Sequence, residues 1–97
     1  MATYILLAIY TEQGIKGIKD TVKRTETTRE LAKKAGLTMK ESYWTLGAYD
    51  VVALFEAPDD ETMTAFSLSV AKLGNVKTQT LRAFSPKEMG GILGKMV

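Results

Sequence analysis

The 97-residue chain contains neither cysteine nor histidine. Without cysteine it can form no disulfide, no thiolate nucleophile and no cysteine-ligated zinc or iron–sulfur site. Without histidine it lacks the usual general base near neutral pH, the common haem ligand and the nucleophile–histidine pairs of hydrolases. We therefore expect no cofactor and no metal, and any catalysis would have to use Asp, Glu, Lys, Arg, Tyr or Ser.

The sequence also lacks long apolar runs and a strong charge imbalance. No run approaches the roughly 20 residues that span a bilayer, and the first residues carry no basic segment or cleavage site of a signal peptide. Thirteen basic and 11 acidic residues give a net charge of +2, too balanced to indicate nucleic acid or a membrane surface. We expect a cytoplasmic protein with neither partner.

Two apolar segments dominate what is present. Tyr4–Tyr10 is a nearly continuous apolar run that predicts a central strand buried on both faces, and Val51–Ala57 predicts a second apolar strand. Leu37–Leu46 and Val76–Phe84 alternate more loosely and predict two further strands. Between the second and third strands, Gly47–Asp50 suits a hairpin loop.

The segment Ile15–Ala35 has helical periodicity and ends at Gly36, a typical C-terminal residue for a helix. Its expected apolar stripe consists of Ile15, Ile18, Val22, Leu31, Ala32 and Ala35. Thr25 and Thr28 lie close to this stripe. Either their methyl groups pack while their hydroxyls bond to the preceding turn, or they form a polar lining under the helix.

A second helix is predicted after Pro58, with Asp59 or Asp60 as its N-cap. Its apolar stripe consists of Met63, Phe66, Val70 and Leu73. The run of Asp59, Asp60 and Glu61 is interpreted as capping rather than metal binding, since consecutive residues point in different directions. After Ser85, a glycine-containing tail over residues 85–97 predicts a short helix that packs on the body or on a partner.

The element order is therefore βαββαβ, which predicts one α+β domain of the ferredoxin-like type over residues 1–97. Right-handed crossovers place the first and third strands, the two most apolar, at the centre of a four-stranded antiparallel sheet. Both helices would cover one face. The other face needs a second copy, so we expect a homodimer and leave higher oligomers open.

Several stretches resemble one family of small bacterial and archaeal proteins. They are Tyr10–Lys16 after the first strand, Leu46–Asp50 at the hairpin, Glu56–Glu61, Leu73–Thr78 and Thr80–Phe84. On these stretches the chain is identified as a member of the GYD family, with a match over nearly the whole chain except the glycine-rich tail. Ala48 interrupts the Gly-Tyr-Asp that names the family, while Gly47 keeps the turn.

The part from Gly47 onward is also similar to the effector-binding domain of leucine-responsive regulators. Both resemblances imply the dimeric α/β barrel, in which two ferredoxin-like sheets pack together. The regulators' DNA-binding helices are not expected, because one βαββαβ unit uses all 97 residues. The GYD resemblance itself implies no established activity.

The candidate ligand-binding residues fall in three places. At the hairpin, Gly47, Tyr49 and Asp50 either contact a small ligand or only cap and anchor the loop. On the second strand, Glu41 and Tyr43 share one face by period two, and they either line a cavity or lie at a solvated edge. On the last strand, Arg82 is a candidate partner for Glu41 or for a ligand carboxylate.

The basic residues at the start of the first helix are a weaker candidate. Helix N-termini attract anions, but no glycine-rich phosphate loop accompanies them, and a solvated helix face explains them better. These residues are Lys16, Lys19, Lys23 and Arg24.

The leading hypothesis is a homodimeric module that binds or senses a small molecule, at the Gly47–Asp50 loop or between the two sheets. The alternative is a small cofactor-free enzyme of the isomerase, decarboxylase or monooxygenase type, with Asp50, Glu41 or Tyr43 as acid or base. Its warrant is analogy of fold, which does not determine function. A purely structural dimer is the third interpretation.

Overall fold

The computed structural model describes all residues from 1 to 97. One antiparallel sheet has the strand order β2-β3-β1-β4, which confirms the ferredoxin-like arrangement and its two central strands. In chain order the elements are β1 (Ala2–Tyr10), α1 (Glu12–Lys16), the 3-10 helix η1 (Ile18–Asp20), α2 (Thr21–Lys34), β2 (Thr38–Trp44), β3 (Val51–Ala57), α3 (Asp60–Ala71), β4 (Val76–Ala83) and α4 (Pro86–Leu93).

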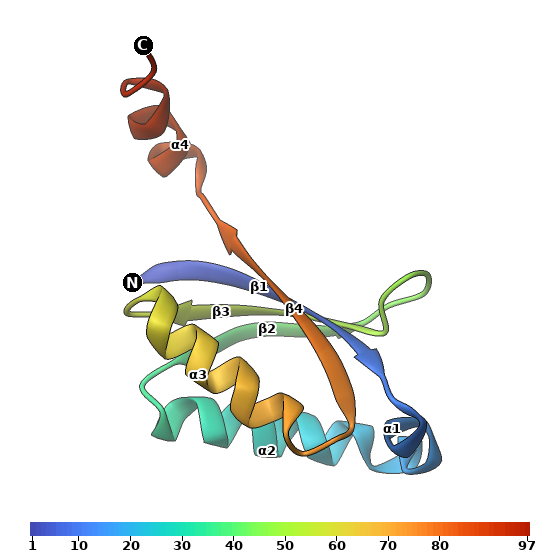
Figure 1. Cartoon of the computed structure of the whole chain (residues 1–97). Helices are drawn as coiled ribbons and strands as arrows, with labels where there is room; N and C mark the ends of the chain where they lie inside the picture. The colour runs from blue at the N-terminus through green and yellow to red at the C-terminus, as the bar shows by residue number, and fades with distance from the viewer.

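The core lies between the sheet and the two longer helices, α2 and α3, which cover the same face (Figure 1). Strand alternation sends every second residue of β1 and β3 into it. Phe55 of β3 and Phe66 of α3 meet there with ring centroids 5.2 Å apart. The expected stripe of α3 is confirmed at Met63, Phe66 and Val70, whereas Leu73 lies beyond the helix and is 53% exposed.

The prediction of a single helix over Ile15–Ala35 was wrong for the first half of that segment. The chain breaks at Gly17 into α1 and η1, and only then begins α2. Because the break resets the helical phase, Ile15 and Val22 are 54% and 60% exposed instead of facing the core. The inward side of α2 carries Thr25, Thr28 and the fully buried Ala32.

Helix α4 continues from the end of β4 and stands away from the rest of the chain, on the side of the sheet opposite α2 and α3 (Figure 1). Its start is a capping box, in which the hydroxyl of Ser85 accepts from the backbone N–H of Glu88 and the Glu88 carboxylate accepts from the backbone N–H of Ser85. None of its residues is buried. None of the helices combines the length and apolar character that crossing a bilayer requires.

Candidate functional site

The face of the sheet that no helix covers is apolar at its centre. Ile5 of β1 stands opposite Leu54 of β3 on one side and Leu81 of β4 on the other. Leu7 stands opposite Val52. We call these five residues the open face; four are half-buried, and Leu81 is 40% exposed. The expectation that β1 is buried on both faces therefore fails within one chain. A contiguous apolar patch of this kind marks an interaction surface.

Glu41 and Tyr43 lie beside the open face, on the edge strand β2. Glu41 is paired with Leu54 and Tyr43 with Val52, so both side chains share that side of the sheet, as the period of two predicted. The Tyr43 hydroxyl donates to Glu41 Oε2 at 3.3 Å, and Tyr43 is 53% exposed. The two form a polar pair at the border of the apolar centre.

The hairpin between β2 and β3 turns at Gly47, whose φ of +115° is a conformation that side chains with a β-carbon rarely adopt. Within the loop, the hydroxyl of Thr45 donates to the carbonyl of Tyr49 at 2.7 Å. Tyr49 in turn donates its own hydroxyl to Gln79 Oε1 of β4 at 3.0 Å. Since Gln79 pairs with Leu7, the Tyr49 side chain reaches the end of the open face.

Asp50 forms hydrogen bonds with the backbone of β1 at the same end of the sheet. Its carboxylate accepts from the backbone N–H of Tyr10 at 2.9 Å, and its own N–H donates to the carbonyl of Ala8 at 2.9 Å. These bonds join the hairpin to the last residues of β1. This geometry supports a structural role for the Asp50 carboxylate.

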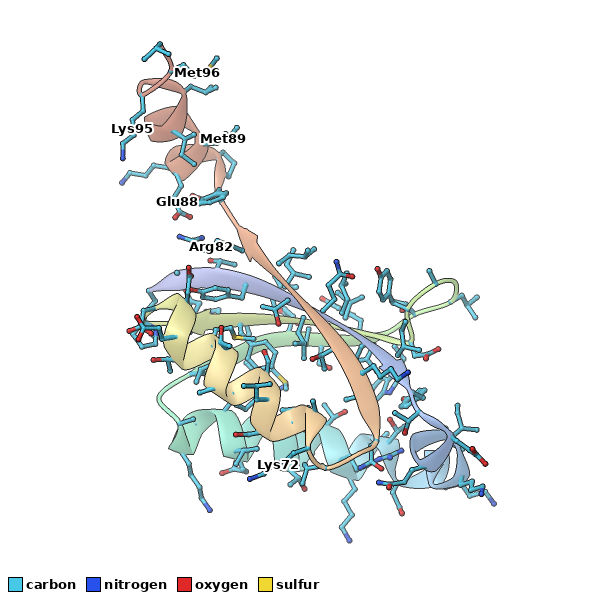
Figure 2. The ribbon with its side chains drawn as sticks, in the orientation of Figure 1. Lys72, Arg82, Glu88, Met89, Lys95 and Met96 are labelled. Atoms are coloured by element: carbon cyan, nitrogen blue, oxygen red, sulfur yellow. The ribbon has the colours of Figure 1, made fainter.

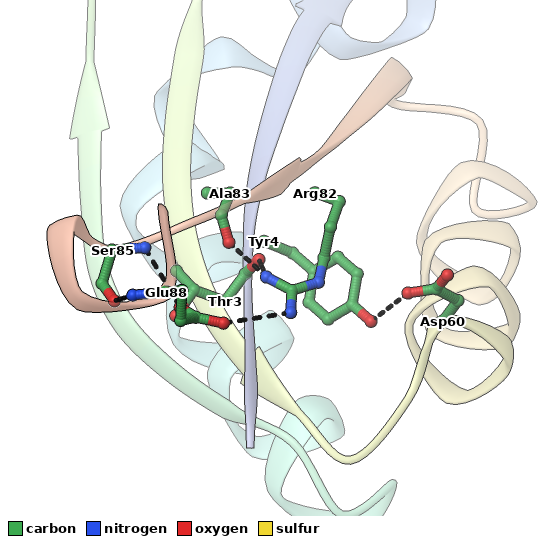
Figure 3. Close-up of polar contacts among 7 residues, drawn as sticks. All are labelled: Thr3, Tyr4, Asp60, Arg82, Ala83, Ser85 and Glu88. Atoms are coloured by element: carbon green, nitrogen blue, oxygen red, sulfur yellow. Dashed lines mark hydrogen bonds and ion pairs between the residues drawn. The ribbon is translucent and has the colours of Figure 1, made fainter. Parts of the chain in front are cut away.

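Arg82 lies on the other side of the sheet from Glu41, because it pairs with Tyr4 on the helix-covered face. The strands that carry Arg82 and Glu41 are also opposite edges of the sheet. The proposed pairing of Arg82 with Glu41 was therefore wrong. Arg82 pairs instead with Glu88 of α4, with a nitrogen–oxygen distance of 3.3 Å (Figure 3). Its guanidinium also lies 4.6 Å from the ring centroid of Phe84.

Tyr4 and Asp60 form a contact that the sequence did not predict. The hydroxyl of Tyr4, a side chain only 3% exposed, donates to Asp60 Oδ1 at the start of α3 (Figure 3). This hydrogen bond, together with burial, raises the pKa of Tyr4. The Arg82 guanidinium lies 5.6 Å from the same ring. Period-two alternation predicts that Tyr4 faces inward, but it gives no information on a partner 56 residues away.

The acidic run after Pro58 is confirmed as a helix start. Asp59 is the N-cap, and its carboxylate accepts from the backbone N–H of Thr62 at 2.8 Å, which lowers the pKa of Asp59. Nowhere in the chain do three acidic, histidine or cysteine side chains gather closely enough to hold a metal ion.

The candidate residues therefore divide into separate groups. Glu41, Tyr43 and Tyr49 border the open face, Asp50 supports the backbone, and Arg82 starts on the helix-covered face and pairs with Glu88 of α4. They do not converge on one pocket in a single chain.

Comparison with known proteins agrees with this architecture. The GYD domain matches residues 4–93, a range that also includes α4, which the sequence analysis had left outside the resemblance. The glutamine synthetase and cystathionine beta-lyase binding protein of Thermus thermophilus is 36% identical over 84 residues, covering 86% of this chain and 88% of that protein.

Among solved structures, the crystal structure of FFRP-DM1 is similar with a TM-score of 0.64. The likeness covers 87% of this chain and 100% of that one, at 19% sequence identity. At that identity it supports the fold alone. From the match over residues 4–93 and the Thermus relative, we conclude that this chain belongs to the GYD domain family.

Proposed function

We propose that the chain is a homodimeric binding module in which two copies pack their open faces together. The observation that carries this proposal is the apolar centre of that face, built from Ile5, Leu54 and Leu81 in register across three strands. Opposed sheets pack about 10 Å apart with interdigitating side chains, and such contacts stabilise by roughly 25 cal/mol per Å² of apolar surface buried. A chain of 97 residues gains more from this than a larger one would, because its own core is small.

Helix α4 fits the same arrangement. It projects on the side of the open face (Figure 2). Its apolar residues Met89 and Leu93 are 45% and 53% exposed, and Met96, just beyond its end, is 73% exposed. An eight-residue helix is marginal in water unless an apolar side packs on something. In the proposed dimer, α4 packs on the second copy, held at its base by the pairing of Arg82 with Glu88.

The dimer would bind a protein partner through the tip of the hairpin. Leu46 at this tip is fully exposed, at 103%. Trp44, at the end of β2, donates its indole N–H to Thr21 on the helix-covered side and is 46% exposed. Exposed apolar and aromatic side chains on and next to a hairpin loop are typical of protein contacts. The Thermus relative is named for binding glutamine synthetase and cystathionine beta-lyase, and these two enzymes are the first partners to test.

A small molecule would enter this arrangement between the two sheets. Glu41 and Tyr43 would border that space, and Gly47, Tyr49 and Asp50 would form its end. Arg82, on the helix side, would act only through its hold on α4. In the dimer the space becomes partly enclosed, the kind of place that small ligands occupy in proteins.

The binding role is tested with purified glutamine synthetase and cystathionine beta-lyase of the source organism, mixed with this protein and analysed by size-exclusion chromatography with light scattering. We expect a complex with at least one of them that is lost in Leu46→Asp and retained in Ala48→Ser, at a neighbouring exposed position. The proposed partner class is wrong if neither enzyme forms a complex, and the proposed surface is wrong if Leu46→Asp binds as well as the wild type.

A further inference from the structure

A cavity of about 160 Å³ lies between α2 and the sheet, on the side opposite the open face. The small residues Ala8 and Ala53 form part of its floor, and Thr25 and Thr28 of α2 form part of its roof. Both alanines are almost fully buried, at 3% and 2% exposure. The proposed dimer contact makes no use of this space, since it lies inside one chain.

The cavity persists because α2 is tied to the sheet at both ends. At its first residue, the Thr21 hydroxyl is hydrogen-bonded to the Tyr10 hydroxyl at 2.6 Å and accepts from Trp44 Nε1 at 3.1 Å. Towards its other end, Arg29 donates to the carbonyl of Met39 at 2.8 Å, and Ala32 is fully buried. Between these two ends, the middle of α2 lies above short side chains. It cannot move closer to the sheet without breaking one of these hydrogen bonds.

The threonines make the roof apolar. Thr25 donates its hydroxyl to the carbonyl of Thr21 at 3.0 Å, and Thr28 donates to the carbonyl of Arg24 at 2.8 Å. With the hydroxyls bonded inside the helix, the methyl groups remain for the cavity. The back-bonding of the first interpretation from sequence is confirmed, whereas its packed methyl groups are not, because both threonines line a cavity.

Arg24 is the one charged residue that lines the cavity. Arg24 donates through one terminal nitrogen to the carbonyls of Gly14 and Gly17, each at 3.1 Å, and takes part in none of the chain's ion pairs. A guanidinium has five N–H donors, so most of them are left for another acceptor. No aspartate or glutamate lines the cavity. The lining therefore favours an anionic group near Arg24 and offers no carboxylate to a ligand ammonium.

We propose that this cavity binds a small monocarboxylate with a compact aromatic or branched aliphatic body and no amino group. Its size supports this class, since an apolar protein cavity of about 150 Å³ holds benzene. The apolar body would lie between the two alanines and the two threonines, and the carboxylate would accept from Arg24.

The probe is benzoate, titrated into the isotope-labelled full-length protein and followed by amide NMR spectra. We expect saturable shifts for Ala8, Ala53, Thr25 and Thr28, and none of comparable size from benzylamine, which matches benzoate in shape but carries the opposite charge. If benzoate shifts none of these signals, or if benzylamine binds equally well, the proposal is overturned.

Two variants act on the site in different ways. Arg24→Gln should weaken benzoate binding by about tenfold or more, because it removes a charge-assisted hydrogen bond. Lys23→Gln, its exposed neighbour outside the cavity lining, should leave binding unchanged. Thr28→Leu, which fills the roof with a good helix former, should abolish binding while the thermal unfolding temperature is kept. Unchanged benzoate affinity in either Arg24→Gln or Thr28→Leu, with the fold intact, would contradict the proposal.

These results are independent of the proposed dimer and its protein partners. A monomer that binds benzoate through Arg24 supports the cavity and counts against the dimer, and a dimer without benzoate binding does the reverse.

Discussion

Gly14 packs directly against the backbone of Asn75. A β-carbon built on Gly14 would lie 2.0 Å from the carbonyl oxygen of Asn75, which accepts the N–H of Thr11 at 3.1 Å. The contact joins α1 to the turn before β4, two segments that lie far apart in the chain. Around it, Thr11 donates its hydroxyl to Gly74 and Gln13 donates to Leu73.

Gly14→Ala should therefore destabilise the protein despite placing a better helix former in α1. The β-carbon forces backbone against backbone, and overpacking of this kind typically costs about 1–3 kcal/mol. Gly17→Ala is the matched control, because the nearest atom to its added β-carbon is 3.9 Å away. Urea unfolding measures both. Equal stability of the two variants would mean that Asn75 can move aside freely.

The Asp50 carboxylate should matter for folding rather than for ligand chemistry. Asp50→Ala leaves the Tyr10 N–H without its acceptor and should lower the free energy of unfolding by about 1–3 kcal/mol. Asp50→Asn retains an acceptor oxygen and should lose less. If Asp50→Asn unfolds as easily as Asp50→Ala, the negative charge itself, and not the hydrogen bond, is what the site requires.

The pKa of Tyr4 gives a prediction at high pH. The hydrogen bond to Asp60 and burial raise this pKa, so the folded state disfavours the tyrosinate. Stability from this contact is complete below the unfolded value of about 10 and is lost as the pH rises through the higher folded value. In an absorbance titration, one tyrosine should ionise at a higher pH than the others, and this late transition should be absent from Tyr4→Phe.

The control for that titration changes one acid at a time. Asp60→Asn should move the late transition towards the ordinary range, since it weakens the hydrogen bond that raises the pKa of Tyr4 most and removes a neighbouring negative charge. Glu61→Gln, at the next position on the exposed helix start, should not. A late transition that stays unmoved in Asp60→Asn would show that the negative charge of Asp60 does not raise the pKa of Tyr4.

At low pH the first element to loosen should be the start of α4. The backbone N–H of Ser85 and the nearby Arg82 lower the pKa of Glu88, so the folded state favours the carboxylate. The sign is opposite to that of Tyr4. The contribution is present above the unfolded value of about 4.3 and is lost as the pH falls through the lower folded value.

Amide signals of Ser85 and its neighbours, followed by NMR during acid titration, test this prediction. Their change should follow the Glu88 side chain and should be absent from Glu88→Gln. If the wild type and Glu88→Gln lose α4 at the same pH, the carboxylate does not hold the helix.

The fold was predictable where apolar pattern and turn chemistry agreed. Val51–Ala57 begins and ends where the sequence predicted, because an apolar run there is bounded by a glycine turn and by Pro58. The first helix was less predictable. Ile15, Ile18 and Val22 fit a helical period, but Gly17 interrupts the helix, and the phase after such a break depends on tertiary contacts.

The candidate site was predictable only as far as strand alternation reaches. The shared side of Glu41 and Tyr43 follows from the period of two. The position of Arg82 depends on register, which is set by the pairing of whole strands and not by its neighbours. The cavity under α2 arises from short side chains on three separate elements, and no local pattern reveals that they meet.

The proposed packing of two sheets is tested most directly by the mass of the protein in solution, measured by light scattering or sedimentation. We expect twice the 10.7 kDa of one chain. Leu54→Lys, at the centre of the open face, should yield monomer, and Leu68→Lys, at a 65% exposed position on α3, should remain dimeric. A wild-type protein that stays monomeric across the accessible concentration range, or a Leu54→Lys variant that dimerises normally, would contradict the proposed packing of two sheets.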